Sequence, residues 1–126
     1  MLKLVLIGLG GFLGAIARYG LSGLVQRCCG GSFPTGTLAV NVSGCFAIGV
    51  LMYLVEERGL FDPDARRFLQ VGFLGAFTTF STVGYETFEM LRSGDLRLAL
   101  ANVLGSVVLG VGAVAVGWKA GKAIGL

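Results

Sequence analysis

The sequence predicts an all-α membrane protein that forms one domain over residues 1–126 and contains four transmembrane helices. Hydrophobic residues make up 55% of the chain and charged residues 13%, whereas soluble domains contain about 25% charged residues. The apolar residues fall into four blocks, residues 4–25, 37–55, 68–91 and 98–118. Each block has roughly the 20 residues that a ~30 Å hydrocarbon core requires, and none shows the polar face of a soluble helix.

The first block, residues 4–25, is too long for a cleavable signal peptide, and three more apolar blocks follow it. The connections between blocks, residues 27–36, 56–67 and 92–97, are too short to hold an extramembrane domain. We therefore expect the function to lie on helix walls or at helix ends.

Four spans place both termini on one side of the membrane. Six basic residues lie on that side (Lys3, Arg58, Arg66, Arg67, Lys119 and Lys122) and three on the other (Arg27, Arg92 and Arg97). The positive-inside rule favours cytoplasmic termini, but a bias this modest also permits insertion in both orientations.

Glycine accounts for 22 residues, well above the average of about 7%. Lipid gives helices no hydrophobic drive to associate, so small residues that allow close backbone approach indicate a tightly packed bundle. Such a bundle has no room for a wide aqueous lumen, so a solute route is narrow or forms between subunits. Two copies in opposite orientations would supply the inverted symmetry common in transporters, and we expect an antiparallel homodimer.

The third block contains four hydroxyl residues within five positions, Thr78, Thr79, Ser81 and Thr82, after Gly72 and Gly75. This composition is poor for a continuous helix and predicts a break near residues 75–78, giving two half-helices near the midplane. A break frees carbonyl groups that bind a cation and amides that favour an anion. The simpler alternative is that each hydroxyl binds the carbonyl four residues back and bends the helix.

The embedded polar groups favour an anion as the transported ion. No acidic residue precedes Glu56, and a cation pore would usually carry acidic residues or a dedicated carbonyl filter. The embedded donors are instead the Arg18 guanidinium, the Asn41 amide and the hydroxyl groups, and Phe80 adds a positive ring edge. Residues 82–86, TVGYE, are similar to a potassium filter, but they lie inside a spanning block without a separate pore helix.

The sequence contains three motifs: residues 14–19 (GAIARY), 34–41 (PTGTLAVN) and 72–82 (GFLGAFTTFST). With these motifs the chain resembles the small fluoride channels of the Fluc (CrcB) family, and the resemblance covers the whole chain. It implies a dual-topology antiparallel homodimer in the cell (plasma or inner) membrane. This dimer would conduct fluoride passively and lower cytoplasmic fluoride. The resemblance also implies a structural sodium ion, held by the backbone carbonyls of Gly75 and Thr78 from both subunits.

The resemblance further implies a set of residues along the fluoride pathway: Arg18 near the pore mouth, Thr37 with Glu86 as a polar pair, Asn41 lining the pore, Phe80 as the first of two phenylalanines, and Ser81 and Thr82 beside it. The chain departs from the family at Val83, which stands where the second phenylalanine is expected. Valine offers no ring edge to an anion. Asn102 and Ser106 stand where a polar track along the fourth helix is expected.

Three other functions agree less well with the sequence than a channel does. A proton-coupled small multidrug exporter needs an embedded carboxylate, typically in the first helix, and residues 4–25 contain none. A non-transporting membrane accessory protein would leave the hydroxyl cluster unexplained. An enzyme is disfavoured because the sequence has no histidine and no nucleophile–base pair in reach by spacing, and its three cysteines lack the spacing of a zinc site.

Overall fold

The computed structural model describes residues 1–125, which form helices joined by short connections, without any strand. The elements in chain order are α1 (Leu2–Cys29), α2 (Thr35–Glu56), α3 (Pro63–Arg66), the π-helix η1 (Arg67–Leu74), α4 (Gly75–Phe77), α5 (Phe80–Arg92) and α6 (Leu96–Ile124).

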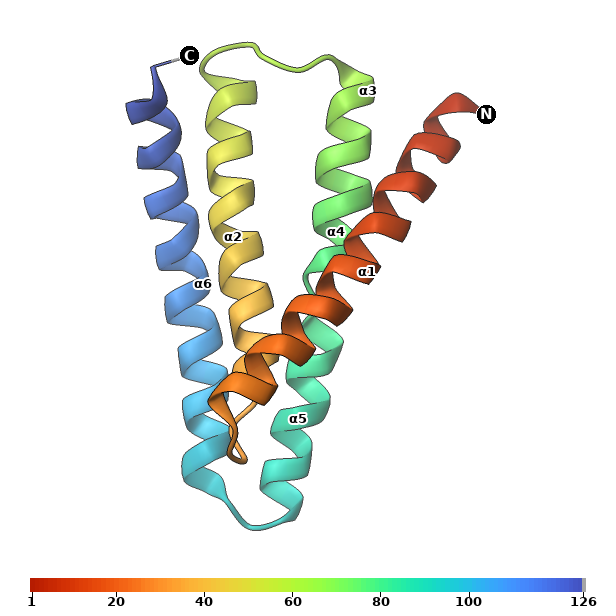
Figure 1. The fold of residues 1–126 in the computed structure, drawn as a ribbon. Coiled ribbons are helices and arrows are strands. Elements are labelled where there is room, and N and C mark those ends of the chain that lie inside the picture. The colour runs from red at the N-terminus through yellow and green to blue at the C-terminus, as the bar shows by residue number, and fades with distance from the viewer. Residues whose placement is uncertain (126) are drawn as a thin grey trace.

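Helices α1, α2 and α6 are each long and apolar enough to cross a membrane, and the chain is a multi-pass membrane protein. The segments from α3 to α5 make the remaining pass, interrupted between α4 and α5, and both termini lie at the same end of the molecule (Figure 1). The helices run beyond the apolar blocks at both ends; α6, for example, continues through Lys119 and Lys122 to Ile124.

Backbone contact between glycines and neighbouring helices packs this bundle. Helices α2 and α6 lie side by side (Figure 1). A Cβ added at Gly49 would overlap the Val114 carbonyl of α6, and one added at Gly117 would overlap the Phe46 carbonyl of α2. Here the helices approach so closely that no side chain fits between them.

Helix α1 crosses the interrupted pass and packs against η1 in the same way (Figure 1). An added Cβ at Gly10 would overlap the Phe68 carbonyl, and one at Gly14 would overlap the Phe73 carbonyl. Gly10 and Gly14, which are spaced as in a GxxxG motif, therefore face the broken pass and hold it next to α1.

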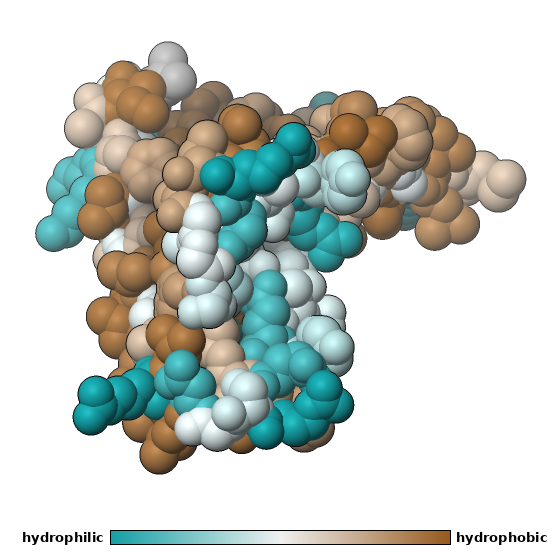
Figure 2. All heavy atoms as spheres, turned by 60° about the horizontal axis from the view of Figure 1, so that its bottom comes forward, coloured by the Kyte–Doolittle hydropathy of each residue, from teal (hydrophilic) through white to brown (hydrophobic). Residues whose placement is uncertain are grey.

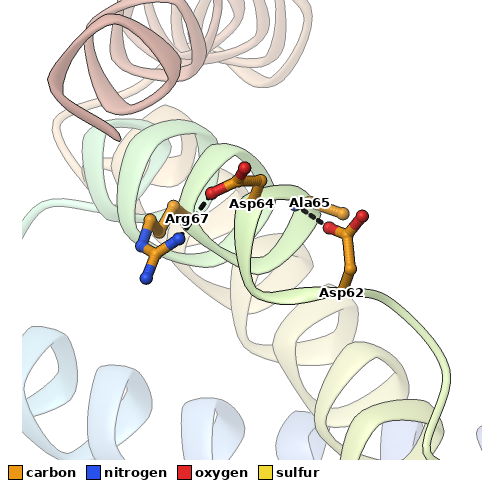
Figure 3. A network of polar contacts seen from close by, with 4 residues as sticks. All are labelled: Asp62, Asp64, Ala65 and Arg67. Atoms are coloured by element: carbon orange, nitrogen blue, oxygen red, sulfur yellow. Dashed lines mark hydrogen bonds and ion pairs between the residues drawn. The ribbon is translucent and has the colours of Figure 1, made fainter. Parts of the chain in front are cut away.

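The interrupted pass starts at a capped turn outside the apolar region. Asp62 accepts a hydrogen bond from the Ala65 amide at 2.7 Å, Pro63 occupies the first helical turn, and Asp64 pairs with Arg67 (Figure 3). A side-chain cap and an early proline are standard helix-start features. They fix where this pass begins.

The break lies at Thr78 and Thr79, at the C-terminal edge of the region in which the sequence predicts it. Gly75 is helical (φ −61°, ψ −37°), whereas Thr78 has ψ 156° and Thr79 has φ −149° and ψ 117°. Gly75 itself therefore does not interrupt the helix. The π-helical turns of η1 before it were not predicted, because glycine-rich apolar sequence does not distinguish i→i+5 from i→i+4 bonding.

Candidate functional site at the helix break

Asn41 of α2 takes the place of helical hydrogen bonds at the break. Its Oδ1 accepts from the Thr79 amide at 2.8 Å, and its Nδ2 donates to the Thr79 carbonyl at 3.0 Å. Thr79 is only 8% exposed, so water cannot serve as the hydrogen-bond partner of these backbone groups. One asparagine thus satisfies both polar groups of the residue at which the helix opens, as buried backbone requires.

The same geometry leaves the Gly75 and Thr78 carbonyls of the third pass without their helical donors. In a continuous α-helix the Thr79 amide would bind the Gly75 carbonyl and the Thr82 amide would bind the Thr78 carbonyl. Instead the Thr79 amide donates to Asn41, and the Thr82 amide donates to the Thr79 hydroxyl at 3.3 Å. Gly75 and Thr78 also line one pocket together. Carbonyl oxygens of this kind are ligands suited to a hard cation.

The hydroxyl cluster divides into two roles. The Thr78 hydroxyl donates to the Leu74 carbonyl four residues back, at 3.0 Å. This is the local bond to the helix backbone that the simpler alternative expects of each hydroxyl. Thr79 instead caps α5, with its hydroxyl 2.9 Å from that of Thr82 and 3.3 Å from that of Ser81. These three hydroxyls gather at the N-terminus of α5, where the helix dipole favours negative charge.

A polar pocket of about 670 Å³ lies between α1, α2 and α5. It brings Arg18, Thr37, Thr82 and Glu86 together, and Thr79 also lines it. The Thr37 hydroxyl donates to Glu86 Oε1 at 2.6 Å, while Glu86 Oε2 is buried without a partner among the described residues. The predicted polar pair is thus a direct hydrogen bond beside the Arg18 side chain.

Gln26, which no sequence pattern marks, also lines this pocket. Its Oε1 accepts from the Thr35 hydroxyl at 3.2 Å and the Gly36 amide at 3.1 Å, and its Nε2 donates to the Phe33 carbonyl at 3.2 Å. Gln26 therefore caps α2 from a different helix and fixes the connection between them. A glutamine at the end of an apolar block was the only available signal.

Hydrophilic side chains gather around the end of the molecule that holds the α1–α2 and α5–α6 connections, while the flanks are mostly hydrophobic (Figure 2). Gln26 and Arg18 both line the polar pocket, and Gln26 contacts the α1–α2 connection. The pocket therefore leads from the helix break toward a water-facing end.

A second, largely apolar pocket of about 610 Å³ lies on the other side of the break. It is lined by Asn41, Gly75, Thr78, Phe80 and Val83, among others, and Thr79 lines both pockets. Phe80 is 88% exposed, whereas Val83 is 7% exposed and packs inward. The two positions of the expected phenylalanine pair therefore line the same pocket but differ strongly in exposure.

Two predicted residues fall outside this grouping. Ser81 is exposed and lines neither pocket, although its hydroxyl reaches that of Thr79. Asn102 is 1% exposed and faces Thr87 of α5 instead of an open track. Ser106 does line the apolar pocket, and its hydroxyl has no hydrogen-bond partner within residues 1–125.

Comparison with known proteins places these features in a family. Residues 5–118 match the family model described as CrcB-like protein, Camphor Resistance (CrcB). The chain is 51% identical over 113 residues to a fluoride-specific ion channel FluC of Solibacter usitatus, covering 90% of this chain and 93% of that one. It is 47% identical over 117 residues to fluoride-specific ion channel FluC 1 of Methanosarcina acetivorans, covering 93% and 88%. The FluC channel of Nitratidesulfovibrio vulgaris is 44% identical over 124 residues, covering 98% and 100%.

Proposed function

Because the chain belongs to the CrcB family, we propose that it is a fluoride-selective ion channel that lets fluoride leave the cell passively and so lowers cytoplasmic fluoride. The observation that carries this proposal is the broken third pass, which Asn41 holds through two hydrogen bonds to Thr79 and which a polar pocket flanks. Relatives of similar length that are 44–51% identical are named fluoride-specific channels.

The donor groups near the break suit a small, hard anion. Asn41 uses one N–H on the Thr79 carbonyl, and an amide side chain carries two, so one remains for an anion. The Arg18 guanidinium lines the polar pocket and would attract an anion toward it. On this proposal fluoride passes Arg18 and the Thr37–Glu86 pair, then reaches Asn41, Ser81, Thr82 and the edge of Phe80.

The proposed working unit is an antiparallel homodimer. In a bilayer every backbone polar group needs a partner, yet the Gly75 and Thr78 carbonyls lose their helical donors beside an open apolar pocket. A second copy against this face would cover the pocket and bring Phe80 of each chain next to the other's break. The modest charge bias of the connections is compatible with two orientations.

The residues at the break also fit a structural sodium ion. Gly75 and Thr78 of each chain would supply two carbonyl oxygens, and two chains would supply four. The ion would balance carbonyl dipoles that have no amide donor. We expect replacement of sodium by a bulky organic cation to lower the thermal midpoint of the purified dimer by about 5 °C or more, because a ligand bound only to the native state stabilises it. A midpoint independent of sodium concentration would contradict this ion.

The experiment that tests the proposed function is anion efflux from liposomes containing the purified full-length chain. Fluoride should leave at least about tenfold faster than chloride, as expected of a selective filter. Protein-free liposomes give the leak rate. Absence of fluoride efflux, or chloride efflux at the same rate, would overturn the proposal and favour an accessory role. Proton-coupled export of cationic drugs by the same liposomes would favour the multidrug exporter.

Substitution of Val83 by phenylalanine is expected to raise fluoride efflux by about two- to tenfold, the range that an added aromatic interaction supports. Val83 lines the apolar pocket of about 610 Å³, which has room for the larger ring. The measurement is initial efflux from liposomes at matched protein density, with Val83→Leu as a control that adds volume without a ring edge. Equal or faster efflux through the native valine form would refute the prediction.

A further inference from the structure

Half-helix α5 is held in the chain by few elements. Among the elements of the bundle it packs most extensively against α6. Its links to α2 are polar, through Thr79 to Asn41 and through Glu86 to Thr37. A directional contact with α6 would add to these two polar links in fixing the rotation of α5 about its axis.

Such a contact exists between Asn102 of α6 and Thr87 of α5. The Asn102 Nδ2 donates to the Thr87 hydroxyl oxygen at 3.0 Å, and that hydroxyl donates to the Val83 carbonyl at 2.7 Å. A hydroxyl has one proton, so both bonds form together only in this direction, from Asn102 through Thr87 to Val83. Asn102 is 1% exposed, so its amide has no competing water.

This relay ends at Val83, whose exposure differs from that of Phe80 on the same helix. Val83 is 7% exposed and Phe80 is 88% exposed, although three residues on a helix place them only about 60° apart around the axis. Both residues line the apolar pocket, so a modest rotation of α5 would change how far each of the two side chains projects into it. The relay fixes that rotation, because it ties the Val83 carbonyl to a buried side chain of another helix.

We propose that Asn102 is a positioning residue that sets the rotation of α5, and thereby the orientation of Phe80 and Val83 in the ion pathway. Its role in permeation rests on the proposed function. Asn102 does not contact the ion on this proposal, because its side chain is inaccessible and its amide bonds to Thr87. This distinguishes it from Ser106, one turn further along α6, whose hydroxyl lines the apolar pocket without a partner.

The test compares four full-length variants in liposomes: Asn102→Leu, Thr87→Val, the double variant and Thr87→Ser. Each of the first two should slow fluoride efflux by about three- to twentyfold, the size of a polar contact between membrane helices. Thr87→Ser keeps the hydroxyl and should retain the native rate. The double variant strands no buried polar group, so its thermal midpoint should return toward that of the native chain, while its efflux stays slow. Native efflux in the double variant, or a slow Thr87→Ser, would overturn the proposal.

A second readout does not depend on transport. Trp118 is the only tryptophan, so Trp118→Phe combined with Phe80→Trp places a single reporter on α5. Loss of Asn102 should change quenching of this reporter by brominated lipid, and unchanged quenching would contradict the positioning role. If the native chain conducts no fluoride while quenching still changes, the proposed function fails and the positioning role stands.

Discussion

Replacement of Asn41 by leucine is expected to abolish fluoride efflux and to destabilise the folded chain more than any other single polar substitution at the break. Leucine leaves the amide and the carbonyl of Thr79 without partners, and Thr79 is buried. Each stranded group costs about 1–3 kcal/mol, so the two together cost about 2–6 kcal/mol. Efflux from liposomes and the thermal midpoint in detergent measure the two consequences.

A matched control lies two residues further along the same helix. Ser43 is exposed and its hydroxyl binds back to the Val40 carbonyl, so Ser43→Ala removes a polar group of α2 without touching the break. Its midpoint and efflux should stay at native values. If Asn41→Leu were as stable as Ser43→Ala, the side chain of Asn41 would not be what holds the break open.

The role of Asn41 also explains how far the sequence alone could locate the break. Clustered hydroxyls and glycines in residues 72–84 predict an interruption, and the structure has one. Its position depends on a partner 38 residues earlier in the chain, which no local pattern contains. Gly75 remains helical because a glycine does not interrupt a membrane helix while its amide keeps a backbone acceptor.

In the candidate site, too, local sequence patterns predict some residues, whereas others are recognised only from contacts between helices. The family resemblance implied Thr37 and Glu86 as a pair, and the structure joins them at 2.6 Å. Gln26 and Thr87 were not predicted, because a lone glutamine or threonine near an apolar block has no period or spacing that marks it. Both act through contacts between helices, Gln26 with Gly36 and Thr87 with Asn102, and such contacts follow from packing.

A single methyl group added between α1 and η1 is expected to destabilise the folded chain strongly. A Cβ at Gly14 would overlap the Phe73 carbonyl and lie 3.0 Å from its carbon, and neither backbone atom can rotate away. Gly14→Ala should therefore push α1 off η1 and destabilise the chain by about 1–3 kcal/mol, the usual cost of overpacking. Size-exclusion profiles and thermal midpoints of the purified protein measure this loss.

The same displacement should reach the ion pathway. Arg18 follows Gly14 by one helical turn and lines the polar pocket, so movement of α1 would withdraw the guanidinium and slow fluoride efflux. Gly8→Ala is the matched control on the same helix, since nothing lies within 4 Å of its added Cβ and alanine is the better helix former. Equal thermal midpoints for the two variants would mean that α1 and η1 do not meet backbone to backbone. Equal fluoride efflux would mean that the position of Arg18 in the pocket does not depend on this contact.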